Sequence, residues 1–342
     1  MKRWQSLMSI VVAVGVVAAG CSDDDEERSS GSGGSGTEDL EVGRYASSDP
    51  GSVNTYWLET SDGLVVIDAQ RTPSDADRVL AAIEDTGLPV TGILVTHAHP
   101  DHVGGLGSLH DAHPQASIHA SEATITSMED DPLGLFDLAR QDLAEYPERL
   151  TIPDQVIARD EQLEVGDVDL VTAELGPAES ASTTVLYEPR SGSLFTGDLI
   201  DEEATPALLE GHTCGWLTQL EQLQERFADA RTIYPGHGVP GDPDDLIERQ
   251  REYLLTVRRL VLPTIDADSP EGARVSPDER AQVGGALEAS FPGYMDRRVA
   301  SLPAELLLEL NLDAVADELQ AENTDELPRA CRPHGAGAPA AP

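Results

Sequence analysis

Three histidines and one aspartate lie within six residues of one another in a single segment, T-H-A-H-P-D-H-V-G-G (96–105). The apolar run 91–96 leads into this segment and predicts a buried strand that ends there. Imidazole and carboxylate groups are the usual ligands of zinc, and the first two histidines point to the same side of an extended chain. The aspartate and the third histidine follow the bend at Pro100 and can face a second metal. The spacing therefore indicates a site for two metal ions, built on His97, His99, Asp101 and His102.

This segment resembles the H-x-H-x-D-H signature of the metallo-β-lactamase-fold hydrolases. Two later segments agree with the family: S-L-F-T-G-D-L (193–199) resembles its strand end with a bridging aspartate, and Y-P-G-H-G (234–238) resembles its late histidine. The resemblance implies that Asp198 bridges two metals and that His237 binds the second one. It covers residues 40–240, because N-T-Y (54–56), D-G (62–63) and I-D (67–68) match the opening hairpin of the family.

The resemblance implies an α+β fold, a four-layer αββα sandwich with the metal pair at one edge between the two sheets. The mingling of strand-length apolar runs with helical stretches agrees with this class. Strands are predicted at 53–60, 64–68, 91–96, 116–119, 155–158, 168–173, 183–187 and 193–196. Helices are predicted at 73–86, 133–149, 215–228, 244–261, 278–289 and 304–320.

One residue of the family pattern is missing. The superfamily usually has a histidine between the H-x-H-x-D-H segment and the bridging aspartate, but none of the nine histidines lies between residues 120 and 211. The segment L-G-P-A-E-S-A-S (175–182) stands between two predicted strands where that histidine belongs. We therefore predict Glu179 as the third ligand of the first metal, because two histidines and a glutamate form a known catalytic zinc set. His212 is the alternative ligand, and a solvent-exposed Glu179 beside a weakened first site is a further alternative.

The resemblance implies a metal-dependent hydrolase with two divalent metal ions as cofactors, expected to be zinc. A glutamate in place of a histidine makes the first site harder, so that Mn²⁺ or iron also suits it. In such enzymes a hydroxide that bridges the two metals attacks the substrate, and Asp101 is expected to orient this hydroxide or to collect a proton. Asn54, Tyr56 and His212 are candidates for the substrate cleft, and ordinary strand packing is the alternative for the first two.

The expected substrate is a small molecule with an ester, lactone, thioester or related bond. The bridging Asp198 makes the predicted shell look more like those of glyoxalase II-type thioesterases and lactonases than like those of β-lactamases. A phosphodiesterase or sulfatase on the same fold is one alternative. A surface metal-binding lipoprotein without significant turnover is another, and the glutamate in the third position favours it.

The N-terminus has the pattern of a secretion signal. Lys2 and Arg3 precede the apolar stretch 10–19, and small residues directly precede Cys21. This pattern resembles a lipoprotein signal (1–21), which implies a lipid anchor on Cys21 and a position outside the cytoplasm on the cell membrane. The acidic and Gly/Ser-rich run 22–38 predicts a flexible tether. A plain signal peptide or an uncleaved anchor is the alternative.

The net charge of the chain limits the classes of partner that it can bind. The 342 residues include 22 basic and 63 acidic side chains, the formal net charge is −41, and Lys2 is the single lysine. Such a charge repels phosphate backbones, which argues against a nucleic-acid partner. It suits a halophilic protein, since salt screens the self-repulsion of an acidic surface, but an ordinary acidic surface is the alternative.

The remaining predictions concern domain limits and cysteines. A hydrolase domain is predicted at 39–245, a helical C-terminal extension at 246–327 and a flexible tail at 328–342. The leucine-rich stretch 302–319 is amphipathic, and such a helix can cap the cleft, join two copies in a homodimer or only pack on the sandwich. Cys214 and Cys331 can form a disulfide or stay free, and the sequence leaves both outcomes open.

Overall fold

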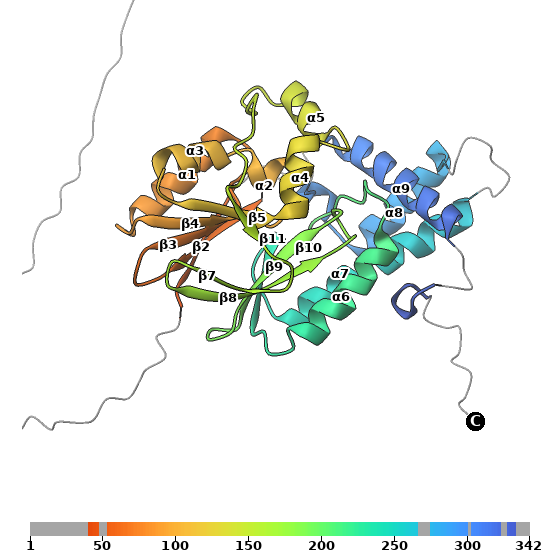
Figure 1. The fold of residues 1–342 in the computed structure, drawn as a ribbon. Coiled ribbons are helices and arrows are strands. Elements are labelled where there is room, and N and C mark those ends of the chain that lie inside the picture. The colour runs from red at the N-terminus through yellow and green to blue at the C-terminus, as the bar shows by residue number, and fades with distance from the viewer. Residues whose placement is uncertain (1–39, 48–52, 266–273, 300–301, 323–326, 333–342) are drawn as a thin grey trace, which may run out of the picture. The chain divides into compact units, whose positions relative to one another are not determined.

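The computed structural model describes residues 40–47, 53–265, 274–299, 302–322 and 327–332 (Figure 1). They belong to one compact unit, Asp39–Pro342. The predicted signal with Cys21, the tether and most of the predicted tail lie outside the described residues. In the part of the chain that is described, no helix is long and apolar enough to cross a membrane.

The first sheet has six strands in chain order. They are β1 (Val42–Ala46), β2 (Asn54–Glu59), β3 (Leu64–Ile67), β4 (Val90–Leu94), β5 (Ser117–Ser121) and β6 (Gln155–Ile157). The strand β2 pairs antiparallel with both β1 and β3, and β3 to β6 run parallel. Every residue of β3 is buried, as expected of a strand that is covered on both faces of its sheet.

The second sheet has five strands in the order β11-β10-β9-β8-β7. They are β7 (Gln162–Val165), β8 (Val168–Leu175), β9 (Thr183–Glu188), β10 (Ser193–Asp201) and β11 (Thr232–His237). The pairing is antiparallel except between β10 and β11. Because these two strands run parallel, their carboxyl ends lie at the same edge of the sheet.

The helices form the two outer layers. They are α1 (Pro73–Glu84), α2 (Pro100–Val103), α3 (Leu106–Ala112), α4 (Glu122–Asp130), α5 (Leu135–Asp142), α6 (Thr213–Arg226), α7 (Pro243–Val261), α8 (Pro277–Ser290) and α9 (Ala304–Ala321). Short 3-10 turns lie at η1 (Leu262–Thr264), η2 (Met295–Arg297) and η3 (Arg329–Cys331). Figure 1 shows α1 and α3 over the first sheet and α6 and α7 over the second.

Three apolar clusters show why the layers stack in this way. The central cluster joins side chains from both sheets, such as Ile67 and Leu94 from the first and Leu170 and Phe195 from the second. A second cluster packs the first sheet on α1, α3 and α5, and a third packs the second sheet on α6 to α9. The four-layer αββα sandwich predicted from the sequence is confirmed.

Several elements differ from their predictions. The helix predicted at 133–149 is shorter, because α5 ends where Leu143 adopts an extended backbone. The strands β1, β7 and β11 and the helices α2, α3 and α4 were not among the predicted elements. The helix α4 begins where the Ser121 hydroxyl accepts a hydrogen bond from the backbone of Thr124, which is a typical N-cap.

The C-terminal helices continue the outer layer over the second sheet. The helix α7 begins at Pro243, beside the predicted domain limit at residue 245, and packs on α6, β10 and β11. A disulfide between Cys214 and Cys331 ties the start of α6 to η3, so the question that the sequence left open is answered. This bond spans 117 residues of the chain.

Candidate metal centre

The seven predicted ligands come together at one edge of the sandwich. They lie after β4, in α2, after β8, in β10 and at the end of β11; they are His97, His99, Asp101, His102, Glu179, Asp198 and His237. Five of these side chains belong to residues that are buried to at least 96%, and the other two, His99 and Asp101, are largely enclosed. Positions more than a hundred residues apart in the sequence therefore share one small site.

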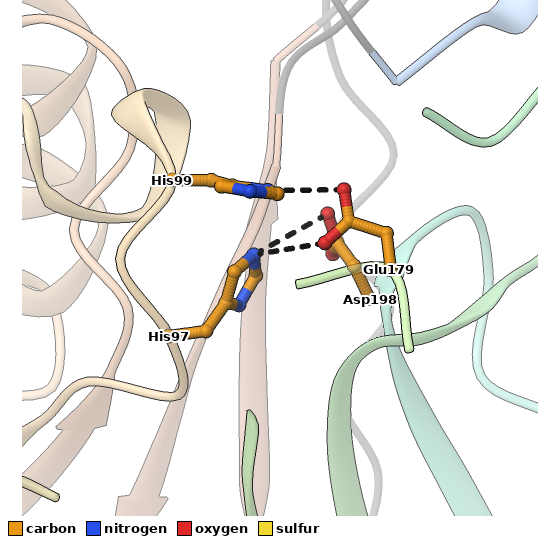
Figure 2. Close-up of side chains that lie close together, drawn as sticks. All are labelled: His97, His99, Glu179 and Asp198. Carbon is orange, nitrogen blue, oxygen red and sulfur yellow. Dashed lines mark ion pairs between the residues drawn. The ribbon is translucent and has the colours of Figure 1, made fainter. Parts of the chain in front are cut away.

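The first group of ligand atoms surrounds His97 and His99. The Nδ1 atom of His99 lies 3.0 Å from Glu179 Oε1, and the Nε2 atom of His97 lies 3.6 Å from Glu179 Oε2. Asp198 Oδ2 lies 3.8 Å from the same His97 atom. Figure 2 shows the two imidazoles facing the two carboxylates across a short gap. These four side chains could hold one metal ion, since their ligand atoms all lie within 4.8 Å of one another.

The second group lies on the other side of Asp198. His237 Nε2 is 3.3 Å from Asp101 Oδ2 and 3.4 Å from Asp198 Oδ2. His102 Nε2 is 3.2 Å from Asp198 Oδ1. Asp101, His102 and His237 therefore could hold a second ion, and Asp198 faces both groups.

The polar atoms at the centre fit a pair of cations. The Nε2 atoms of His97, His102 and His237 are buried and make no hydrogen bond, and the same is true of Glu179 Oε2 and Asp198 Oδ1. Leaving a buried polar atom without a partner costs about 1–3 kcal/mol, so five such atoms at one place call for a ligand that binds them together. Nitrogen and carboxylate oxygen in this mixture are the donors that zinc and similar divalent ions prefer.

Two of the histidines are oriented by residues behind them. Asp68 accepts hydrogen bonds from the Thr96 backbone and hydroxyl, both at 2.8 Å, and its Oδ2 also lies 2.8 Å from His102 Nδ1. Because the Thr96 hydroxyl donates to Asp68, its oxygen is left to accept from His97 Nδ1 at 3.0 Å. Each ring thus uses Nδ1 as a donor and turns Nε2 toward the centre, the arrangement that fixes metal-binding histidines.

His99 has the opposite orientation. Its Nδ1 faces Glu179, and its Nε2 lies 3.4 Å from Glu210 Oε1. Glu210 precedes α6 in the sequence and was not predicted as part of the site. A carboxylate behind the ring orients His99 in the way that Asp68 orients His102.

Burial and mutual attraction shift the pKa values of these groups strongly in the protein without metal. Burial lowers the pKa of the His97 imidazole well below its usual value, and charge on His102 lowers it further. Burial also lowers the pKa of His237, but the Asp198 and Asp101 carboxylates outweigh this effect and raise it to about 10. Burial raises the pKa of Glu179 to about 7. Without metal, protons therefore occupy part of this site at neutral pH.

Two glycines permit the close approach of β10 and β11. A Cβ atom on Gly236 would collide with Asp198 Oδ1, so a side chain at this position is incompatible with the observed place of the carboxylate. Gly197, next to Asp198, has a φ of +51°, a conformation that favours glycine. The glycines of the two matched segments thus serve to place the carboxylate between the imidazoles.

A further buried carboxylate lies beside the second group. Asp201 is 4% exposed, neither of its oxygens makes a hydrogen bond, and Asp198 and His237 are close enough to share an ion with it. Burial, together with the charge on Asp198, raises its pKa well above the usual value. The sequence analysis missed it, although its place three residues after Asp198 on the same strand was a usable signal.

A cleft opens onto the metal-facing groups. It has about 740 Å³ of space, including its open mouth, and reaches His99, Asp101, Glu179 and Asp198. Arg71 also lines it, and its NH2 group lies 3.2 Å from Asp101 Oδ2. Arg71 was missed because it stands in a loop thirty residues before its partner.

The predicted cleft residues are placed differently. Asn54 and Tyr56 are each 3% exposed and donate hydrogen bonds to the backbone oxygen of Pro235 at 3.0 and 2.9 Å, so the alternative of strand packing describes them. Neither lines the cleft at the metal-facing groups. His212 stands at the start of α6 with its side chain 40% exposed, and it belongs to none of the groups that could hold a metal among the described residues.

Comparisons with known proteins support the same interpretation as the geometry of the site. The uncharacterised protein YobT of Bacillus subtilis (strain 168) is 30% identical over 148 residues, 43% of this chain and 61% of YobT. The chain thus matches about three fifths of the length of that relative. A hydroxyacylglutathione hydrolase of Synechococcus sp. is 28% identical over 207 residues, 55% of this chain and 69% of the hydrolase.

A solved structure shows the same fold. A metallo-beta-lactamase family protein of Thermus thermophilus superposes with a TM-score of 0.57 at 19% identity, over 82% of this chain and 91% of that one. The model of the metallo-beta-lactamase superfamily matches residues 48–237, which is more than half of the chain. The match includes all seven predicted ligands, with His237 at its last position. The resemblance seen in the H-x-H-x-D-H segment is confirmed at this level: the chain belongs to the metallo-β-lactamase superfamily.

Proposed function

We propose that the protein is a hydrolase that binds two divalent cations and cleaves an ester, lactone or thioester bond of a small molecule. The observation that carries this proposal is the set of five potential metal-binding atoms at the centre of the site, which are buried and have no hydrogen-bond partner. The residues that carry these atoms belong to two groups that meet at Asp198. Membership of a superfamily that includes hydrolases supports the same reaction class.

The ligand assignment follows the two groups. His97, His99 and Glu179 would hold the first ion, and Asp101, His102 and His237 the second. Asp198 would contact both ions. Since two carboxylates and two imidazoles surround the first ion, zinc fits well, and manganese or iron fits better than in a site of three histidines.

The roles of the residues follow from their positions. Two bound cations would supply a water molecule of lowered pKa and would polarise the bond to be cleaved. Asp101 faces the cleft, and the attraction of His237 and Arg71 outweighs its burial and keeps its pKa well below the usual value. It is therefore ionised at neutral pH and can orient the attacking water or accept its proton. Arg71 contacts the same oxygen of this carboxylate as His237 does.

The test uses the full-length chain. Metal-stripped protein is loaded with zinc or manganese and assayed with a p-nitrophenyl ester, a lactone, a thioester, a phosphodiester and an alkyl sulfate. We expect turnover of at least one carbonyl substrate that a chelator abolishes, and at least about a hundredfold loss in Asp101→Ala. Asp62→Ala, an exposed aspartate in the β2–β3 turn, is the control.

Two outcomes would contradict the proposal. Tight binding of two metals without turnover of any substrate would favour a metal-binding protein. Turnover of the phosphodiester or the sulfate alone would keep the metal site and replace the substrate class.

We also propose that Cys21 is lipidated and anchors the protein outside the cytoplasm. The support is the position of the cysteine, directly after the apolar stretch and its small residues. In a bacterial or archaeal host, Cys21→Ser is expected to move the protein from the membrane to the soluble fraction. Equal membrane fractions for the two chains, or a mass that shows an unmodified Cys21, would contradict this proposal.

A further inference from the structure

The cleft beside the metal-facing groups has apolar walls. Leu135, Leu138 and Leu143 line it from α5 and the residue that follows it, Leu209 from the loop before α6, and Val299 from the segment after η2. Leu138 is 41% exposed, so its side chain is accessible to a molecule that enters the cleft. These walls converge on Asp101, Glu179 and Asp198, so a molecule lying in the cleft has one end at the metal site.

We propose that this cleft binds an uncharged aliphatic acyl chain, so that the protein prefers medium-chain acyl esters and thioesters over short or anionic ones. The proposal rests on the proposed function, because it takes the scissile carbonyl to lie at the metal-facing groups. Apolar walls stabilise a buried chain by about 25 cal/mol per Å² of apolar surface, and no polar partner is required.

The charges around the cleft exclude an anionic tail. Among the described residues that line the cleft, Arg71 is the single basic side chain besides the histidine at the metal site. Its guanidinium already contacts Asp101 and the backbone oxygen of Val299. Asp142 and Glu210 also line the cleft, and they repel a carboxylate, phosphate or sulfonate. A neutral chain meets neither penalty.

A second pocket shows where the other half of an ester can lie. It shares His99, Leu135 and Glu210 with the first cleft and extends away from it toward α4. Its lining is mixed: Leu133, Leu135 and Phe136 contribute apolar surface, and Ser127, Ser180 and Ser182 contribute hydroxyl groups. A leaving group of mixed polar and apolar character can lie in this pocket while the acyl chain occupies the first cleft.

The experiment compares p-nitrophenyl acetate, butyrate, hexanoate and octanoate with the zinc-loaded full-length chain. Each methylene that becomes buried is expected to raise kcat/KM by about fourfold. Leu138→Ser is expected to lower the ratio of octanoate to acetate turnover by at least about threefold. Leu262→Ser is the matched control, because Leu262 is a similarly exposed leucine in η1 that lines neither pocket.

A binding measurement without metal gives a second readout. In calorimetry with the metal-free protein, uncharged octanamide is expected to bind more tightly than acetamide. It is also expected to bind more tightly than the monoamide of octanedioic acid, which carries a carboxylate at the far end of its chain. Leu138→Ser is expected to weaken the binding of octanamide more than the binding of acetamide.

The outcomes separate this inference from the proposed function. Metal-dependent turnover of all esters at equal kcat/KM, or the same chain-length preference in Leu138→Ser as in the wild type, overturns the acyl cleft and leaves the hydrolase intact. Binding of the octanedioic acid monoamide as tightly as octanamide overturns the exclusion of an anionic tail. Absence of metal-dependent turnover with every ester overturns the proposed function, and octanamide binding then decides on the cleft by itself.

Discussion

Asp68 Oδ2 lies 2.8 Å from His102 Nδ1, and both residues are buried behind the metal-facing groups. The same carboxylate also binds the backbone and the hydroxyl of Thr96, next to His97. One side chain therefore fixes the orientation of a ligand from each of the two groups. Asp68 has a φ of 60°, in the left-handed region that asparagine and aspartate tolerate better than other residues with a side chain.

This relationship predicts the effect of Asp68→Asn. Asparagine keeps the size and the backbone conformation but loses the charge and one acceptor oxygen, so His102 is held less firmly. We expect the affinity for the second metal to fall about 10- to 100-fold, as measured by competition with a chromophoric chelator.

The control variant is Asp160→Asn. Asp160 has a similar φ of 57° and lies in an exposed turn that is distant from Asp68 in the sequence. The metal affinity of this variant is expected to equal that of the wild type. Equal affinities in Asp68→Asn and Asp160→Asn would show that Asp68 has no part in holding the ligands.

Metal binding should depend on pH in a definite direction. With a pKa of about 10, His237 carries a proton at neutral pH in the metal-free protein, and a metal must displace it. Affinity therefore rises with pH, by about tenfold per unit for each proton displaced, below that pKa. Chelator competition from about pH 6 to about pH 8 measures this slope. A flat or falling affinity over that interval would contradict the observed placement of His237 between two carboxylates.

Gly236→Ala tests the close approach of β10 and β11. The added Cβ would collide with Asp198 Oδ1, so the carboxylate must leave its place between the two groups. We expect loss of at least one metal per chain and a destabilisation of about 1–3 kcal/mol. Gly285→Ala is the matched control, since a Cβ there meets open space in α8 and alanine is the better helix former. Full metal content in Gly236→Ala would refute the assignment of Asp198 to the centre.

The disulfide should contribute to stability without contributing to the metal site. Cys214 and Cys331 close a long loop, and removing both as Cys214→Ser with Cys331→Ser is expected to cost about 3–5 kcal/mol of unfolding free energy. Urea denaturation measures the loss, and metal content is expected to remain that of the wild type. An unchanged denaturation midpoint would show that the bond does not form in the protein as produced.

Local patterns in the sequence predicted those parts of the site that are themselves local. His97, His99, Asp101 and His102 could be identified because they lie in six consecutive residues after a buried strand. Glu179 was predicted from its place between two strands, and the structure puts it 3.0 Å from His99. The parallel pairing of β10 with β11 explains why Asp198 and His237, which are far apart in the sequence, lie at the same site.

The residues that were missed act through tertiary contacts. Arg71 meets Asp101 from a loop before α1, and Glu210 meets His99 across more than a hundred residues. Neither position has a local pattern that distinguishes it from the many charged residues of an acidic chain. The strand β1 was missed for a related reason: its residues V-G-R-Y-A are partly exposed at the sheet edge and show no apolar run.

The count of metal ions per chain tests the central claim most directly. Full-length protein is loaded with zinc, dialysed and measured by elemental analysis, beside Glu179→Ala, Glu179→His and the exposed control Glu164→Ala. The two groups around Asp198 predict two ions in the wild type, in Glu179→His and in Glu164→Ala, and one in Glu179→Ala. One ion or none in the wild type, or two ions retained in Glu179→Ala, would contradict the account.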